Sequence, residues 1–181
     1  MSLKIQKISI TEIGVDAIVN AANSQLQHGG GVCGAIFSAA GSRELQEACD
    51  EIGYCETGAA VTTPGFRLKA KFIIHAVGPV WYGGNNGEAE KLYSCYQTAM
   101  AEAKKHDCHS IAFPLISSGI YGYPLEDAWR IAIQSITDWQ KKHGDYHLEA
   151  VIAVIDDRAL WLGNSIMAEL LLPEGDRSEE R

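Results

Sequence analysis

The stretch VDAIVNAANSQLQHGGGVCGAI, residues Val15–Ile36, decides the fold because it joins a strand, a loop and a helix in one run. It begins with the strand-like VDAIVNAA and continues into the polar loop NSQLQH. Three glycines, Gly29–Gly31, then lead into small residues that predict a helix beginning near Val32. Consecutive glycines can turn several N–H groups toward one point, and a helix N-terminus adds partial positive charge. The junction therefore predicts an anion site, with a tightly packed turn as the alternative.

A second strand–loop–helix junction lies further along the chain. The apolar segment SIAFPLI runs into SSGIYGY and then into a helix opened by Pro124. In open α/β sheets, ligands collect at the carboxyl ends of the strands. Two such junctions in one chain favour a cradle in which main-chain N–H groups hold phosphate.

Strand-like and helix-like segments alternate along the whole chain, which predicts one α/β domain over residues 1–172. Near-continuous apolar runs such as FIIHAV indicate strands covered on both faces. The tail PEGDRSEER, residues 173–181, has no apolar residue and is expected to be disordered. Helices are predicted over residues 88–106, 124–144 and about 158–172. The predicted strands are Leu3–Ser9, Asp16–Asn20, Ala59–Thr63, Lys71–Val77, Ser110–Leu115 and Ala150–Ile155.

Composition excludes several classes of protein. The 181 residues are 46% apolar and 21% charged, which is ordinary for a soluble domain. No signal peptide or membrane-spanning run is visible, and the five cysteines form no CxxC pair, so we expect a cytoplasmic protein with reduced thiols. The formal charge of −8 makes nucleic acid an improbable partner. The scattered histidines show no strong metal-ligand spacing, so no metal is expected.

A dinucleotide site is the alternative interpretation of the glycines. GGGVCG, Gly29–Gly34, formally fits GxGxxG, and Asp50 lies about where a ribose-binding acid would. However, NSQLQH separates the glycines from the strand, and Asp50 falls in a helix-like segment. This context disfavours the dinucleotide interpretation.

Three motifs together resemble the macrodomain family, closest to its MacroD-type branch. They are VDAIVNAANSQLQHGGGVCGAI, AKFIIHAVGPVWYGG and AFPLISSGIYGYP, in this order and with the usual spacing from about Lys4 to Ile155. The resemblance implies a three-layer α/β/α fold around a mixed, largely parallel sheet. It also implies a cleft for ADP-ribose or a derivative, without a cofactor or metal.

The resemblance also assigns residues to that cleft. Asn23 resembles the amide that holds the distal ribose, with an Asx-type turn cap as the alternative. Gly30, Gly31 and Val32 match the loop along the distal ribose and diphosphate. His75, within FIIHAV, is interpreted as a hydrogen-bonded core residue. The residues that match the loop on the other side of the diphosphate are Ser117, Ser118, Gly119, Ile120 and Tyr121.

The chain departs from the family pattern at three places. Cys33 replaces the aspartate by which hydrolytic members help to position the attacking water; it is either a catalytic thiolate or a small packed residue. In the segment ISIT, Ser9 stands where an aspartate contacts adenine, and its neighbour Ile10 is included among the ligand contacts. Asp156, also included, falls about where many members place an aromatic residue that stacks on adenine.

The resemblance predicts hydrolysis of an ester bond to the distal ribose, in O-acetyl-ADP-ribose or a mono-ADP-ribosylated protein. Without the usual acid, the expected mechanism is substrate-assisted: the diphosphate orients a water while Asn23 fixes the ribose. The catalytic candidates are therefore Asn23 and Cys33. The competing hypothesis is a non-catalytic module that only reads ADP-ribose, and ADP-ribosylated proteins are the expected partners in either case.

Overall fold

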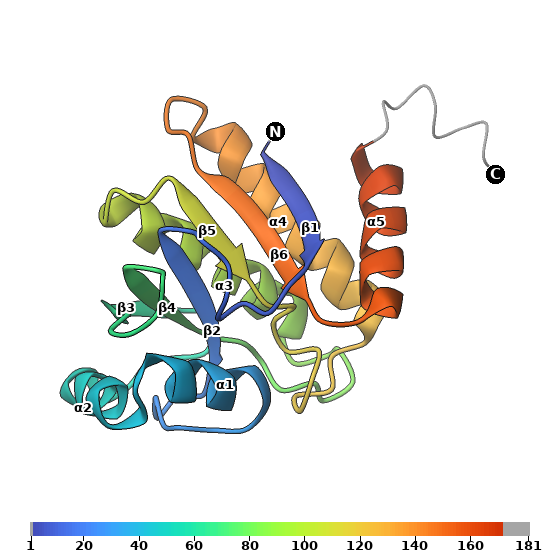
Figure 1. The fold of residues 1–181 in the computed structure, drawn as a ribbon. Helices are drawn as coiled ribbons and strands as arrows, with labels where there is room; N and C mark the ends of the chain where they lie inside the picture. The colour runs from blue at the N-terminus through green and yellow to red at the C-terminus, as the bar shows by residue number, and fades with distance from the viewer. Residues whose placement is uncertain (1, 172–181) are drawn as a thin grey trace.

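The computed structural model describes residues 2–171, which form six strands and five helices in alternation (Figure 1). The predicted disordered tail, 173–181, lies outside the described residues. In chain order the elements are β1 (Leu3–Lys7), β2 (Ala17–Ala22), α1 (Gly31–Ala40), α2 (Ser42–Ile52), β3 (Ala60–Pro64), β4 (Phe72–Val77), α3 (Glu88–Lys105), β5 (Ser110–Phe113), α4 (Leu125–Lys142), β6 (Glu149–Val154) and α5 (Asp157–Leu171).

All six strands form one sheet in the order β1-β6-β5-β2-β4-β3. Every neighbouring pair is parallel except β3 and β4, which are antiparallel. The carboxyl ends of the five parallel strands therefore meet at one edge of the sheet. The mixed, largely parallel sheet expected from the sequence is confirmed.

Alternation along the strands divides the core into two layers. On β2, Ile18 packs toward one face of the sheet and Val19 toward the other. The face of Val19 is covered by α3 and α4, with α5 packed on α4, and the face of Ile18 is covered by α1 and α2 (Figure 1). The predicted three-layer α/β/α architecture is confirmed.

Several predicted boundaries were wrong by a few residues. The strand predicted to reach Leu115 ends at Phe113, because Pro114 has no N–H to donate to the ladder. The strand predicted to reach Ser9 ends at Lys7. Pro124 precedes the first residue of α4 instead of occupying it, and α4 ends at Lys142, short of Gly144.

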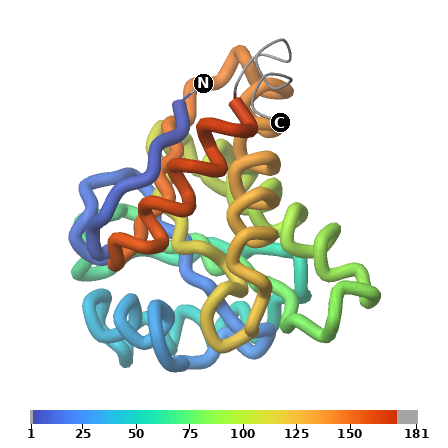
Figure 2. Tube along the Cα trace, turned by 90° about the vertical axis from the view of Figure 1, so that its right-hand side faces the viewer, coloured from blue at the N-terminus to red at the C-terminus, as the bar shows by residue number. Residues whose placement is uncertain are grey.

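The chain ends of the described region meet at one edge, where α5 lies beside β1 (Figure 2). Gly163 of α5 makes this contact possible, because a Cβ there would lie 2.6 Å from Cη2 of Trp129 and 2.9 Å from Cδ1 of Ile5. Trp129 is fully buried on α4 and has no room to retreat. A glycine inside a helix is normally unfavourable, so close packing explains its presence here.

We predict that Gly163→Ala destabilises the protein. Alanine favours the helix over glycine by up to about 1 kcal/mol, which would raise the free energy of unfolding. Overpacking against Trp129 costs about 1–3 kcal/mol, so the net free energy of unfolding should fall. Urea unfolding measures it, and Gly14→Ala, where no atom lies within 4 Å of the added Cβ, is the matched control. A variant Gly163→Ala more stable than the wild type would contradict this packing.

Candidate functional site

One cavity of about 730 Å³ opens at the edge where the parallel strands end. Its walls come from segments that directly follow β2, β4, β5 and β6, and from the first turn of α1. The two loops singled out in the sequence therefore face each other across a common hollow. The lining residues are 21–23, 29–33, Gly78, 114–121, Leu125, 153–156, Arg158 and Ala159.

The first loop is held by the side chain of Asn23. Its Oδ1 accepts from the N–H of Gln27 at 3.0 Å, and its Nδ2 donates to the carbonyl of Gln27 at 2.9 Å. Leu26 is buried in a left-handed conformation, φ 55°, and anchors the loop to the core. Asn23 thus closes the loop on Gln27, four residues on, which is a longer reach than the Asx-type turn considered as its alternative role. It still has a second N–H and a second lone pair free to face the cavity.

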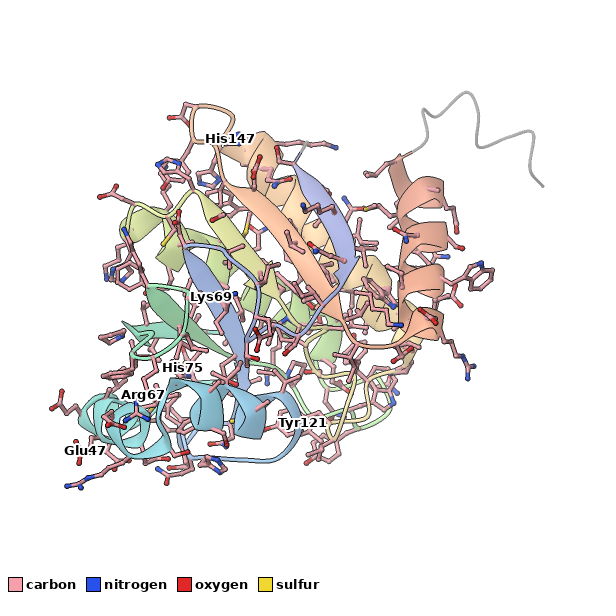
Figure 3. All side chains as sticks on the ribbon, viewed as in Figure 1. Glu47, Arg67, Lys69, His75, Tyr121 and His147 are labelled. Carbon is pink, nitrogen blue, oxygen red and sulfur yellow. The ribbon has the colours of Figure 1, made fainter. Side chains whose placement is uncertain are left out.

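The second loop is held by buried partners behind it. The phenol oxygen of Tyr96, fully buried on α3, accepts from the N–H of Ile116 at 3.0 Å. The N–H of Trp81 donates to the carbonyl of Tyr121 at 2.8 Å. Figure 3 places Tyr121 beside α1, so this loop and the first turn of α1 flank the cavity together.

Ser117 is the strained residue of this loop. It has φ 67°, a left-handed value that costs a non-glycine residue on the order of 1–3 kcal/mol. Its hydroxyl is buried and has no hydrogen-bond partner among residues 2–171. A Cβ at Gly78 would overlap that hydroxyl, so glycine is required where β4 reaches the cavity.

Two runs of three main-chain N–H groups on the cavity walls donate no hydrogen bond within the described chain. Three belong to the first turn of α1, where an α-helix leaves its N–H groups without internal acceptors. The other three belong to consecutive residues of the second loop. The six residues are Gly31, Val32, Cys33, Gly119, Ile120 and Tyr121.

Cys33 lies at the wall of the cavity in the first turn of α1 and is only 7% exposed. Its Sγ lies 3.7 Å from Nδ2 of Asn20, which donates to it, and 3.8 Å from the carbonyl of Gln27, to which the thiol donates. Both contacts are weak because sulfur is a poor hydrogen-bonding atom. The thiol is held in place from both sides.

Asn20 connects this thiol to a histidine buried below the cavity. Asn20 and His75 are partners in the register of β2 and β4, and their Nδ2 and Nδ1 atoms are 3.1 Å apart. Thr63 donates to the carbonyl of Pro64, so its oxygen accepts from Nε2–H of His75 at 2.9 Å. That leaves Nδ1 to accept from Asn20, in a neutral ring.

Burial keeps the His75 ring uncharged. The side chain has no exposed surface and lies between the sheet and the helices α1 and α2 (Figure 3). Desolvation lowers its pKa from 6.5 to about 4. The interpretation of His75 as a hydrogen-bonded core residue is confirmed.

Glu88 is a supporting residue that the sequence did not reveal. Its side chain is 2% exposed at the start of α3 and accepts from the N–H groups of Tyr82, Gly84 and Asn86 at 2.6–3.0 Å. Although burial alone would raise the pKa of Glu88, these main-chain hydrogen bonds outweigh it and hold the pKa below the usual value. The segment so fixed includes Trp81, which contacts the second loop.

The structure brings together most residues that the sequence assigned to the site. Two positions that the sequence analysis assigned to adenine contacts need comment. Ile10 is buried in the core and does not line the cavity. The hydroxyl of its neighbour Ser9 forms a hydrogen bond with the hydroxyl of Thr11. Asp156 does line it, but its carboxylate also accepts the N–H of Ala159 at 2.7 Å and so caps α5. The predicted residues on the cavity wall are Asn23, Gly30, Gly31, Val32, Cys33, Ser117, Ser118, Gly119, Ile120, Tyr121 and Asp156.

Other wall residues were not predicted. Gly78, directly after FIIHAV, could have been found from its place at the end of an apolar strand. Arg158 has no such signal, and it is the only cationic side chain on the wall within residues 2–171. In that same part of the chain no cluster of three His, Cys, Asp or Glu side chains suits a metal ion, and no helix is long and apolar enough to span a membrane.

Fold and cavity define a three-layer α/β/α protein with one large hollow at the carboxyl edge of its sheet. A family model described as "Macro domain" matches residues 19–132. A macro domain-containing protein of Chlorobaculum tepidum is 58% identical over 132 residues, which cover 73% of this chain and 76% of that protein. The chain belongs to the macrodomain family.

Two solved structures are similar over most of their length. A mutant macrodomain of Oceanobacillus iheyensis, with ADPR, has a TM-score of 0.87 and 36% identity, and the match covers 93% of each chain. A Trypanosoma brucei macrodomain in complex with ADP-ribose has a TM-score of 0.84 and 33% identity, with 91% of this chain and 68% of that chain covered.

We predict that His75 makes stability depend on pH between 7.5 and 5. Because the folded pKa of about 4 lies below the unfolded value of 6.5, the unfolded state takes up the proton first. Stability from the neutral ring is therefore complete above the unfolded pKa and falls by about 2 kcal/mol between pH 7.5 and 5. Urea unfolding at a series of pH values measures this loss.

The matched control is His147→Gln, which removes an exposed histidine and should keep the pH slope. His75→Gln should be less stable at pH 7.5 but should lose the slope. An unchanged slope in His75→Gln would contradict the assignment.

Proposed function

We propose that this chain binds ADP-ribose, or a derivative of it, in the large cavity and hydrolyses an ester bond to the distal ribose. The six unpaired N–H groups around one hollow are the observation that carries the proposal. They suit a diphosphate, because an anion that accepts main-chain N–H groups needs no lysine beside it. The overall charge of −8 agrees with that mode of binding, as does Arg158, the one cationic side chain on the wall within the described residues.

The size of the cavity and the ligands of related proteins support the same proposal. A volume of about 730 Å³ falls in the range of small-molecule sites. The related macrodomains of Oceanobacillus iheyensis and Trypanosoma brucei were solved with ADPR and ADP-ribose. In this chain we place the diphosphate between the two loops and the distal ribose beside Asn23 and Cys33.

Hydrolysis in this site must rely on the substrate for its base. The ionisable side chains on the described cavity wall are Cys33, Tyr121, Asp156 and Arg158. Asp156 is engaged in capping α5, and the Cys33 thiol donates to a carbonyl. We therefore assign the orientation of the attacking water to the diphosphate, and the fixing of the ribose to the free valences of Asn23. Ester bonds of O-acetyl-ADP-ribose or of ADP-ribosylated carboxylate side chains are the proposed substrates.

A reader module without turnover is the second candidate. Its support is the thiol at position 33, which lacks the charge of an aspartate and makes only weak contacts. Binding does not distinguish the two candidates, because the N–H groups belong to the main chain.

We predict that removing one wall N–H weakens ADP-ribose binding. In Val32→Pro the donor is lost, while proline fits the first turn of a helix and no internal hydrogen bond is broken. A hydrogen bond to a charged group contributes about 1.5–3 kcal/mol, so the Kd should rise at least about tenfold. Calorimetry measures it. Val32→Ala, which keeps the N–H, should bind within about threefold of wild type, because it loses only a partly exposed side chain. Failure of the wild type to bind ADP-ribose would remove the proposal.

Turnover separates the two candidates. We expect the wild type to release free ADP-ribose from a protein that is mono-ADP-ribosylated on a carboxylate side chain. Chromatography measures the amount of ADP-ribose released. Substrate assistance predicts that Cys33→Ala stays within about twofold of the wild-type kcat, whereas a nucleophilic thiol predicts a loss of at least about a hundredfold. Cys33→Asp should raise kcat. Binding without release would establish the reader.

A further inference from the structure

A second, smaller cavity lies behind the loop that forms one wall of the large one. Its volume is about 260 Å³, between the first turns of α3 and α4 and the segment 81–84. It is lined by Trp81, Gly84, Ala89, Tyr123, Asp127, Arg130 and Ile131. Nothing in the proposed hydrolysis uses these side chains.

Tyr123 is the first sign that this cavity takes a ligand. Its side chain is only 4% exposed and lines the cavity, but its hydroxyl has no hydrogen-bond partner within residues 2–171. The hydroxyl oxygen is not fully enclosed by the protein, so it can accept a hydrogen bond from a group in the cavity. The Tyr123 ring packs 4.8 Å from the Trp81 ring, so an aromatic wall stands beside the free hydroxyl.

The charges around this cavity are the second sign. Asp127 is on its wall, and together with Glu88 and Glu90 it adds to the effect of burial in raising the pKa of Tyr123. Within the described chain, Arg130 is the only cationic residue that lines this cavity. Its guanidinium Nη2 lies 3.0 Å from a carboxylate oxygen of Glu126 and 3.0 Å from one of Glu169.

The balance of these charges favours a cation. Asp127 is the carboxylate on the wall, and two further carboxylates, Glu126 and Glu169, hold the Arg130 guanidinium. The two helix N-termini add only about half a positive charge each. The described surroundings of this cavity therefore carry a net negative charge.

We propose that this second cavity binds the guanidinium group of an arginine side chain. A guanidinium is planar and can stack on Trp81 while its N–H fork donates to the carboxylate of Asp127 and to the hydroxyl oxygen of Tyr123. This occupant supplies the partner that Tyr123 lacks and neutralises the acidic wall.

A main-chain hydrogen bond joins the walls of the two cavities, and this contact points to the source of the arginine. The N–H of Trp81, on the second cavity, donates to the carbonyl of Tyr121, on the first. The structure thus assigns the arginine to the protein whose ADP-ribose occupies the large cavity. This assignment rests on the proposed function, whereas the cation site itself does not.

Nα-acetyl-arginine amide tests the cation site. In ¹H–¹⁵N spectra it should cause a saturable shift of the Trp81 indole signal, with a Kd on the order of millimolar, because one ion pair and one stack contribute little. The signal is identified by its loss in Trp81→Phe. Nα-acetyl-citrulline amide has the same shape without the charge and should cause no saturable shift. An equal response to both probes, or none to arginine, overturns the proposal.

Two variants locate the contact without disturbing the core. Tyr123→Phe removes a hydroxyl that bonds no described residue, and Asp127→Asn removes an exposed charge. Each should raise the Kd of the arginine probe at least about threefold. Glu51→Gln, which removes the same charge from an exposed position on α2, is the matched control and should leave it unchanged. A Kd that neither Tyr123→Phe nor Asp127→Asn alters overturns the proposal.

A pair of peptides tests the source of the arginine. Both carry ADP-ribose on a glutamate, and one has arginine nearby where the other has citrulline. The arginine peptide should bind the wild type more tightly, and Asp127→Asn should remove that difference without changing the Kd of free ADP-ribose. If ADP-ribose itself fails to bind, the proposed function fails, but the arginine probe still decides the cation site. Equal binding of the two peptides would refute the assignment of the arginine.

Discussion

Main-chain N–H groups without internal acceptors are the constraint on which the site depends. A helix must leave its first N–H groups unpaired, and the loop after β5 does the same at three consecutive residues. Neither the helix end nor the loop would hold a diphosphate alone, because one helix end attracts an anion only weakly. The parallel order of the strands brings both to the same edge of the sheet, where they share one cavity. The topology of the sheet and the chemistry of the site therefore have a common cause.

The loops keep their shape through contacts that face away from the cavity. Asn23 closes the first loop on Gln27, and Tyr96 and Trp81 support the second from behind. Because these contacts lie within the protein and need no ligand to form, a ligand would enter without having to order the walls. Less of its binding free energy would be lost in fixing loops, which favours affinity. The strained φ of Ser117 fits this view, because a loop held on both sides can keep an unfavourable backbone angle.

Local patterns in the sequence predicted the alternation of strands and helices and both loops, whereas the three layers were implied by the resemblance to the macrodomain family. Apolar runs in the strands and glycine before a helix each leave a visible signal. The contacts of Asn20, His75 and Thr63 leave none, since they require the register of three strands that are distant in the sequence. Glu88 was missed for a related reason: its partners are main-chain N–H groups, which every residue but proline has. The wall where β6 turns into α5 was hardest to predict, because no strong motif marks the positions of Asp156 and Arg158.

Position 33 shows why binding and turnover can change separately in this fold. The N–H of residue 33 contributes to the cavity wall whatever side chain stands there, so the cradle survives the replacement of an acid by a thiol. The side chain itself sits between a donor, Asn20, and an acceptor, the carbonyl of Gln27. A thiol satisfies both weakly and stays neutral, whereas a carboxylate would gain from Asn20 and be repelled by the carbonyl unless its second oxygen reached the cavity. The geometry that accommodates the Cys33 thiol would thus turn a carboxylate at position 33 toward the cavity. There its charge could help to orient an attacking water, but it would not be needed for binding alone.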